Sequence, residues 1–451
     1  MKKVVFISVL LLMCMVTYAQ PYSSVLLNAS YDFPAANDQT IVRVAGDGTH
    51  AVVHVRDGNT PYFYCVNYDA DPMAGINGWT PCYKIPLDTT WIIHDFRTFG
   101  DHVAFCGEVN GQGLYGWFLA NNLISGSSSV HIHTFTVPAV ERFKMMVLGL
   151  KDPFREGPWI ALAAEKYDTI IHNIREYLFQ FDGVFFTSTN YYRMRKLWTS
   201  STDREQVQDL LLENNRFCMI AKDPRFPYSP FTVRCMDSWY MDTQHELDTI
   251  YRYNIGLGES SGRVRGIAMD GTDHFAVAYI SGSSKLKVRC VKLFSLNITT
   301  SQQIHMEKED YRLELSYSDF DDETLAVLQH VNNPNKADTF HLFKPFIRFP
   351  YTMKQLFHDE RKKFTSLDLL HDNFFVSTGN YWAYSQMLPN GDSHKCPSLT
   401  KREVEIIDEY ESNIDTDYQG YDYGSVPGQL HIIYPDPILP KKSCSFGAIT
   451  E

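Results

Sequence analysis

Three aspartates recur in short apolar segments of this chain and are the first candidates for chemistry. Asp95, Asp209 and Asp368 stand in the phrases HDF, QDL and LDL, each in the first strand of a repeated unit. If these strands surround a channel, the carboxylates could bind a cation or act as acid and base on a substrate. Alternatively, they accept hydrogen bonds from backbone N–H groups of neighbouring units. Their recurring position favours this structural role.

A second candidate site consists of aromatic residues at the connections between the second and third strands of the repeats. Aromatic faces suit the C–H surfaces of sugars, and a tyrosine hydroxyl can stay in water. Because 27 Tyr and 29 Phe also fit simple packing between strands, packing is the competing interpretation. The ligand-binding hypothesis places six residues in one exposed patch at one end of the channel. They are Tyr62, Tyr115, Phe226, Tyr228, Tyr381 and Trp382.

Two further motifs lack the context that their chemistry requires. The segment GESSG at 258–262 matches the nucleophile elbow, but a strand-like segment follows it where the elbow needs a helix. His131 and His133 share one face of a strand, but no third metal ligand is identifiable. The sequence therefore predicts no bound metal and no cofactor.

The elements that must position these residues follow from a repeat. A short apolar strand, a polar tight turn and a second apolar strand recur seven times, about 50–57 residues apart. The turns contain Gly48, Gly100, Gly157, Asn214, Gly271, Asp322 and His371. A β repeat of this length predicts an all-β fold, a seven-bladed β-propeller of four-stranded antiparallel blades.

The two ends of the chain suggest export and ring closure. Lys2 and Lys3 precede an apolar run, and Ala19 offers a cleavage site, so residues 1–19 are predicted to be a signal peptide. Residues 20–451 are predicted to form one propeller domain, with an irregular acidic segment at about 396–428. Either 23–31 or 429–435 could supply the strand that closes the ring.

The formal net charge of −12 bears on the possible partners. A chain this acidic is a poor binder of phosphates, so we expect no nucleic-acid partner. The same excess of acid favours a neutral glycan or a polypeptide as ligand. No segment beyond the signal is long and apolar enough to span a bilayer, so no transmembrane segment is expected.

The Lys-Lys signal, the β repeats, the phrase HDF…FCG and a Tyr-rich acidic tail together resemble secreted β-propeller proteins of Bacteroidetes. The resemblance covers most of the chain. It implies a propeller fold and a periplasmic, extracellular or cell-surface location. It carries over no catalytic residues.

Propellers host both enzymes and binding scaffolds, so the fold alone does not decide the function. The absence of a complete catalytic constellation favours a binding or interaction module for a glycan or a polypeptide. The alternative is a polysaccharide-active enzyme, a glycoside hydrolase or lyase, with carboxylates at the channel mouth. Carboxylates held by backbone N–H groups would favour the binding module.

Eight cysteines remain after the predicted signal, and an oxidising compartment would allow disulfides. Cys218 and Cys235 lie on two segments joined by the polar turn DPRFPYSP, and symmetric pairing about that turn places them opposite each other. Cys65 and Cys82 have the same separation in the first repeat. The competing interpretation is that these cysteines are small apolar core residues.

We expect Cys218 and Cys235 to be linked in the exported protein. Peptide mapping without reduction should recover the two tryptic peptides as one species, and the bond should contribute about 3 kcal/mol to the free energy of unfolding. Recovery of both peptides with alkylated thiols would contradict the pairing.

Overall fold

The computed structural model is built almost entirely from antiparallel β-strands. They form five sheets of five strands and one sheet of nine. The one helix among the described residues, α2 (Ala120–Ile124), is a short turn. The structure describes residues 29–32, 39–46, 50–67, 82–124, 127–150, 158–170, 172–182, 191–200, 205–213, 216–222, 231–237, 249–255, 263–269, 274–281, 285–292, 299–305, 311–318, 324–331, 338–343, 352–357, 364–370, 373–378, 381–386, 398–403, 405–409, 414–418, 421–438 and 441–445.

Four of the five-stranded sheets share one plan. Four strands consecutive in the chain form an antiparallel meander, and a fifth strand from the C-terminal part of the chain pairs with the last of them. The sheets are β2 (Gln39–Gly46), β3 (His50–Asp57), β4 (Thr60–Asn67) and β5 (Cys82–Pro86) with β33 (Asp436–Ile438); β14 (Gln206–Glu213), β15 (Arg216–Lys222), β16 (Phe231–Asp237) and β17 (Thr249–Ile255) with β31 (Ile414–Tyr418); β18 (Arg263–Met269), β19 (His274–Ser281), β20 (Lys285–Lys292) and β21 (Thr299–His305) with β30 (Glu405–Glu409); and β22 (Tyr311–Ser318), β23 (Thr324–Val331), β24 (Thr339–Phe343) and β25 (Thr352–Phe357) with β29 (Ser398–Glu403).

The nine-stranded sheet consists of two such meanders joined by one shared outer strand. The meanders are β6 (Trp91–Phe99), β7 (His102–Val109), β8 (Gln112–Leu119) and β9 (Val130–Val137), then β10 (Arg142–Leu150), β11 (Pro158–Asp168), β12 (Asn173–Asp182) and β13 (Tyr191–Thr199). The shared strand is β32 (Tyr421–Ile433), whose first half pairs with β13 and whose second half pairs with β9.

The remaining sheet joins the two ends of the chain. It contains β26 (Phe364–Leu370), β27 (Asn373–Thr378) and β28 (Tyr381–Gln386), followed by β1 (Ala29–Asp32) and β34 (Lys441–Ser445). β1 takes the place of a fourth strand and pairs antiparallel with β28, so that Tyr31 lies opposite Trp382. Of the two closing segments that the sequence offered, the N-terminal one therefore completes this meander, whereas 429–433 lies in β32 and pairs with β9.

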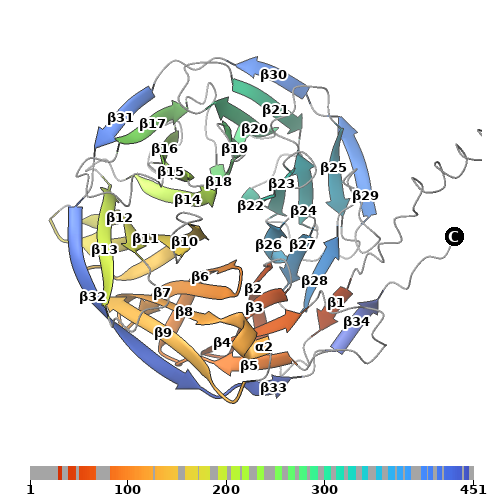
Figure 1. Ribbon diagram of the computed structural model, residues 1–451. Helices are drawn as coiled ribbons and strands as arrows, with labels where there is room; N and C mark the ends of the chain where they lie inside the picture. The colour runs from red at the N-terminus through yellow and green to blue at the C-terminus, as the bar shows by residue number, and fades with distance from the viewer. Residues whose placement is uncertain are drawn as a thin grey trace, which may run out of the picture.

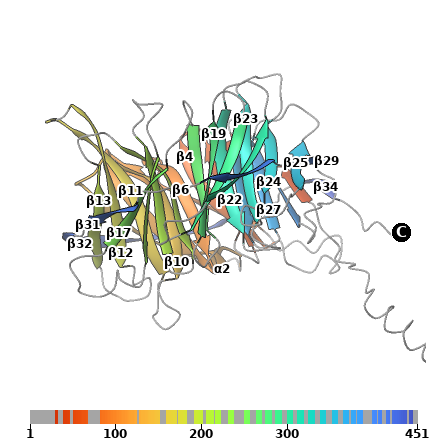
Figure 2. The same ribbon diagram turned by 90° about the horizontal axis from the view of Figure 1, so that it is seen from above.

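The sheets are arranged around a common axis (Figure 1). The first strand of each meander lies innermost, and each inner strand contacts the next, from β2 through β6, β10, β14, β18 and β22 to β26, which contacts β2 again. In the view turned by 90°, strands such as β10, β11 and β22 run roughly along this axis (Figure 2). Each inner strand is the terminal strand of its sheet. Its inner edge therefore has no partner strand.

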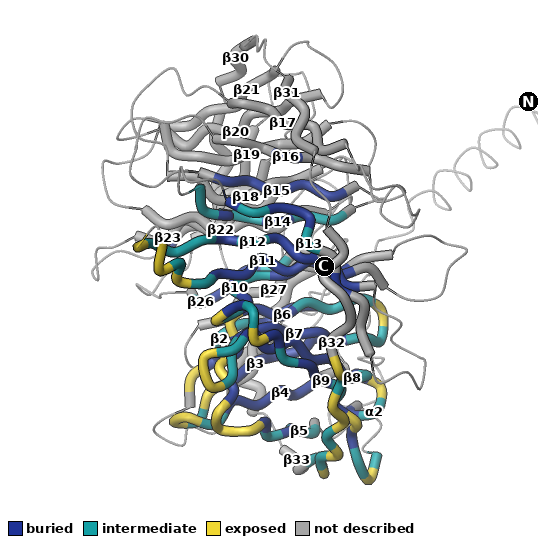
Figure 3. The backbone as a smooth tube through the Cα atoms, turned by 90° about the vertical axis from the view of Figure 1, so that its left-hand side faces the viewer, coloured by how far each residue is buried: buried dark blue, intermediate teal, exposed yellow. Residues whose placement is uncertain are grey.

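Apolar side chains from neighbouring meanders fill the space between them. Tyr115 and Phe135 of one meander pack against Phe181 of the next, with ring centroids 4.6–6.2 Å apart. A second cluster joins β3 and β4 to β6–β9 in the same way. Figure 3 shows the buried residues along the strands and the exposed residues mainly at the turns. Packing of sheet faces thus fixes the angle between meanders.

The C-terminal strands β29–β34 form an outer belt. They follow one another in the chain and pair in turn with β25, β21, β17, β13 and β9, β5, and β1, in reverse order around the ring (Figure 1). The prediction of an irregular acidic segment at about 396–428 is wrong, because most of this segment is strand. Backbone pairing between strands does not require apolar side chains. These strands therefore lack the apolar pattern from which strands are predicted.

No helix among the residues that the structure describes is long and apolar enough to cross a membrane.

We expect loss of the outer belt to expose an unpaired edge on every meander, because each belt strand covers the outermost strand of its sheet. A chain that ends before Ser398 should therefore aggregate, as measured by size-exclusion chromatography. The control ends after Ser445 and keeps every belt strand. A belt-free chain that elutes as a monomer with an unchanged thermal midpoint would contradict this role.

Candidate functional site

The innermost strands carry a one-residue β-bulge at the same place in five meanders, whereas β18 shows a two-residue shift between Val264 and Ile267. At each bulge the strand register skips one residue, which therefore has no opposite partner in the next strand. Such bulges redirect a side chain and bend the strand. The bulged residues are Val42, His94, Lys144, Gln208 and Thr365.

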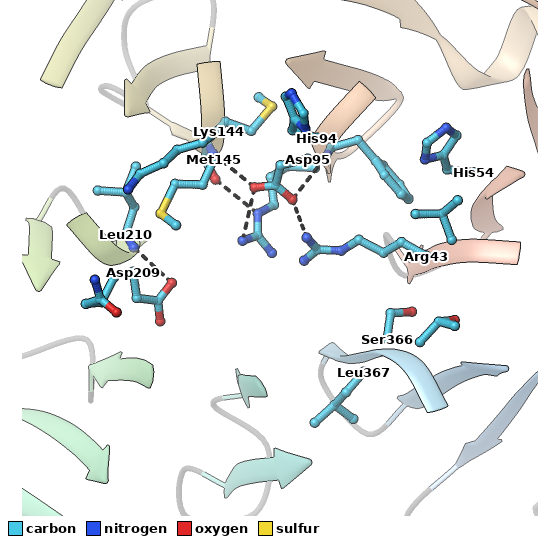
Figure 4. Close-up of a pocket in the computed structure, with 16 residues that line it drawn as sticks. Arg43, His54, His94, Asp95, Lys144, Met145, Asp209, Leu210, Ser366 and Leu367 are labelled. Carbon is cyan, nitrogen blue, oxygen red and sulfur yellow. Dashed lines mark hydrogen bonds and ion pairs between the residues drawn. The ribbon is translucent and has the colours of Figure 1, made fainter. Parts of the chain in front are cut away.

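All five bulged residues line one cavity at the centre of the ring, with a volume of about 280 Å³ (Figure 4). The residues that follow the bulges, among them Arg43, Asp95 and Asp209, line it too. We call this space the channel cavity. The five meanders share the bulge but differ in the side chain that it carries. The fold therefore fixes where these side chains lie, and the sequence determines their chemistry.

Gly107 is required opposite the bulge of β6. A Cβ atom at this position would lie 1.8 Å from the carbonyl oxygen of Ile92. Only glycine lets the backbone of β7 approach this closely. The glycine of the phrase FCG is therefore needed to accommodate the bulge that places His94 and Asp95.

Asp95 is bonded from several sides at the wall of the channel cavity. It is 4% exposed, and its Oδ1 accepts the N–H of Phe96 at 3.0 Å and a guanidinium N–H of Arg43 from β2. Its Oδ2 accepts the N–H of Met146 from β10 at 3.0 Å and lies 3.5 Å from Nη2 of Arg97. Four donors are about as many as a carboxylate accepts, so Asp95 bridges three meanders and has little capacity left for a substrate proton.

The meander of β26 is joined to that of β2 through equivalent bonds. Ser366 directly follows its bulge, as Asp95 does, and its Oγ accepts the N–H of Val44 at 3.0 Å. Asp368 accepts the N–H of Gly46 at 3.0 Å. Side chains of one meander therefore bond backbone N–H groups on the inner edge of the next.

The three predicted carboxylates occupy two different positions. Asp95 and Asp209 each directly follow a bulged residue, line the channel cavity and accept the N–H of the next residue. Asp368 stands two residues further along its strand and is not among the lining residues. The structure thus brings Asp95 and Asp209 together at the channel cavity. Asp95 and Asp368 accept backbone N–H groups of a neighbouring meander.

Lys144 and Glu176 form a buried pair beside the cavity. Lys144 Nζ donates to Glu176 at 2.6 Å and to the carbonyl of Val207 at 2.8 Å. Glu176 is 1% exposed and also accepts the N–H of Val207. Burial raises the pKa of the Glu176 carboxyl, and the ammonium of Lys144 opposes this shift. The positive charge of Lys144 is therefore compensated locally.

The histidines of the cavity wall are held neutral by burial. Burial lowers the pKa of His54 to about 3, and the nearby Arg56 and Arg43 add to the shift. Burial likewise lowers the pKa of His94. The Nε2 atom of His54 is buried and has no hydrogen-bond partner among the described residues.

A second pocket lies where the connection between β11 and β12 meets that between β9 and β10. Its volume is about 420 Å³. Tyr167 and Ile170 are 45% and 88% exposed, and the rings of Tyr177 and Phe179 stack at 5.9 Å. We call it the mouth pocket; its cationic side chains are Lys166, Arg175 and Lys196, and its carboxylate is Asp168, 2.9 Å from Arg175.

The six aromatic residues predicted to form a patch do not form one among the described side chains. Tyr62 and Tyr115 are 4% and 0% exposed, since tight turns place them inside β4 and β8 rather than on loops. Tyr381 and Trp382 begin β28 and face Asp32 and Tyr31 across the sheet register. Phe226 and Tyr228 lie outside the described residues. Tyr167 and Ile170, at the equivalent connection of the third repeat, are exposed instead, and the sequence prediction did not include them.

The cysteines separate into two cases. Cys218 is disulfide-bonded, and the register places it directly opposite Cys235. Cys65 is present as a buried thiol, and Tyr83, rather than Cys82, lies opposite it. The structure therefore does not support a bond between Cys65 and Cys82, because the two strands are offset by one residue.

We expect Asp95→Asn to lower the free energy of unfolding by about 3–5 kcal/mol, because it leaves two guanidinium groups beside a neutral side chain. Denaturant unfolding should detect this loss. Asp88→Asn is the matched control, since Asp88 is exposed and, among the described residues, its carboxylate bonds Thr90 in its own turn. Equal stability of the two variants would show that Asp95 does not hold the meanders together.

No protein-family model and no curated protein sequence matches this chain. Among solved structures, the uncharacterised protein lmo1340 from Listeria monocytogenes EGD-e is 12% identical over 75% of this chain and 89% of its own, with a TM-score of 0.40. Oligopeptidase B from Leishmania major is 11% identical over 76% of this chain, with a TM-score of 0.35. The chain spans about half of that enzyme, 54% of its length. Likenesses at this level carry no argument about activity, so the function has to be inferred from the two pockets.

Proposed function

We propose that this chain is a seven-bladed β-propeller that serves as an exported binding module. Counting the nine-stranded sheet as two meanders that share β32 gives seven four-strand units around one axis. The succession of contacts between inner strands, which returns from β26 to β2, supports this count.

The observation that carries the binding role is the mouth pocket. Exposed aromatic and aliphatic surface from Tyr167 and Ile170 lies beside the cations Lys166 and Lys196. Exposed apolar side chains cost free energy in water and gain it when a ligand covers them. A tyrosine face suits the C–H surface of a sugar, and an extended polypeptide could use the same surface.

The charge of the mouth pocket refines the ligand class. Arg175 is paired with Asp168, and Lys166 is a further cation that lines the pocket, in a chain whose net charge is −12. The net charge of the chain favoured a neutral ligand, but a ligand interacts most strongly with the charged side chains that line its own pocket. We therefore favour a glycan that carries carboxylates, with an acidic polypeptide as the other outcome of the test.

The channel carboxylates argue against the enzyme. A general acid or base must exchange a proton with the substrate. Asp95 is surrounded by four donors, and Asp368 is bonded to the backbone of the neighbouring meander. Carboxylates held in this way are the arrangement expected of a binding module.

Export remains part of the proposal. The predicted signal peptide, residues 1–19, lies outside the described residues. The disulfide at Cys218 supports an oxidising compartment such as the periplasm or the cell surface.

We expect the full chain without residues 1–19 to bind polygalacturonate, a carboxylate-rich glycan, more tightly than dextran. Tyr167→Ala should weaken this binding by about 1–3 kcal/mol with little loss of stability. Lys166→Gln should also weaken it, and by more at low salt than at high salt, because dissolved ions screen charges near the surface. Isothermal titration provides the measurement, and polyglutamate tests the polypeptide alternative.

Tyr434→Ala is the matched control, because Tyr434 is 72% exposed and lies outside the mouth pocket. Equal losses at Tyr167 and Tyr434 would remove the mouth pocket from the account. Equal binding of dextran and polygalacturonate would contradict the role of charge.

A further inference from the structure

The second half of β32 has an outer edge that no described strand covers. Residues 428–433 pair with β9, and no other strand in the described part of the chain pairs with their opposite edge. This half of β32 lies on the outside of the ring (Figure 1). Its outward N–H and C=O groups are therefore available to a further strand. We call residues 428–434 the belt edge.

Exposed apolar side chains accompany the belt edge. Leu430 and Ile432 are 53% and 55% exposed, and Tyr434, which directly follows β32, is 72% exposed. Residues two apart in a strand share one face of the sheet, so Leu430 and Ile432 lie on the same face. These three residues are half of the six large apolar side chains that the described part of the chain exposes. Apolar side chains concentrated in this way mark an interaction surface, whereas single ones scattered over the surface do not.

The belt edge carries no formal charge. Residues 427–435 include no Asp, Glu, Lys or Arg, whereas each of the other belt strands contains at least one of them. The Nε2 atom of His431 lies 2.9 Å from Oγ1 of Thr134, and burial lowers the pKa of His431. Charged side chains are a usual means by which an edge strand is kept from pairing with another chain. The belt edge lacks this protection.

The charge of the chain indicates which partner fits. Two copies of a chain with a formal net charge of −12 repel each other where acidic surfaces meet, and an uncharged segment avoids this cost. A partner of opposite charge finds no counter-charge at the belt edge. A second copy needs none, because a two-fold axis places identical backbone edges and identical apolar faces against each other.

We propose that two copies of this chain associate through the belt edge, with their β32 strands antiparallel about a two-fold axis. The pairing continues the sheet of each copy into the other, and Leu430 and Ile432 of both copies lie on one shared face. Two strands bury less surface than a standard interface of about 1,600 Å², so the dimer is weak and reversible. The interface is separate from the mouth pocket, because no residue that lines the pocket belongs to the belt edge.

Sedimentation velocity over a range of concentrations tests this proposal on the full chain without residues 1–19. We expect an equilibrium between monomer and dimer that stops at the dimer, because a two-fold contact is closed. Added salt should strengthen the association, since dissolved ions screen the repulsion between two acidic copies. Ile432→Lys should raise the dissociation constant at least about tenfold, because it places like charges at the interface. Ile92→Lys is the matched control, since Ile92 is 40% exposed and lies on β6.

Amide hydrogen exchange of the unaltered chain locates the interface without any substitution. Amides of residues 428–434 should be better protected at high than at low protein concentration, and those of β30 should not change. The proposal is overturned by a dimer whose added protection lies elsewhere, by growth beyond the dimer, or by equal dimerisation of Ile432→Lys and Ile92→Lys. A monomer at every concentration also overturns it and leaves a strand of another polypeptide as the occupant of the belt edge.

Discussion

The structure depends on how the inner edges of its sheets are satisfied. In the part of the chain that the structure describes, each inner strand has no partner strand on the side of the axis, and unpaired backbone N–H groups there would cost free energy. Side chains of the neighbouring meander accept these N–H groups: Asp95 for Met146, Ser366 for Val44 and Asp368 for Gly46. The outer edges are covered by the belt instead.

The need to bond the inner strand edges distinguishes residues that hold the fold together from residues that are available to a ligand. The carboxylates that look most like catalytic groups are used to join meanders, and the guanidinium groups of Arg43 and Arg97 lie beside Asp95 at the channel cavity. The bulges allow both results, because one residue turns into the cavity while the next bonds across the seam. The mouth pocket is built from a connection instead, where exposed residues such as Tyr167 cost the scaffold little.

The sequence predicted the coarse fold and only part of the site. Period-two alternation and tight turns such as Asn110-Gly111 identify strands locally, so the β repeat was visible. A bulge shifts the register by one residue without changing the residue pattern of the bulged strand itself, so Asp368 was aligned with Asp95 although it stands two residues further along. The outer belt, which contains β31, pairs with strands far away in the chain. The negative net charge of the chain, similarly, gave no sign that cationic side chains line the mouth pocket.

The most direct test of the account is amide hydrogen exchange at Met146 in the native chain. Its N–H lies on the inner edge of β10 and bonds Asp95 rather than another strand. The account predicts that this amide is protected to the same extent as amides paired within the ladder between β10 and β11. Exchange of Met146 at the rate of an open edge, with the ladder amides still protected, would contradict it.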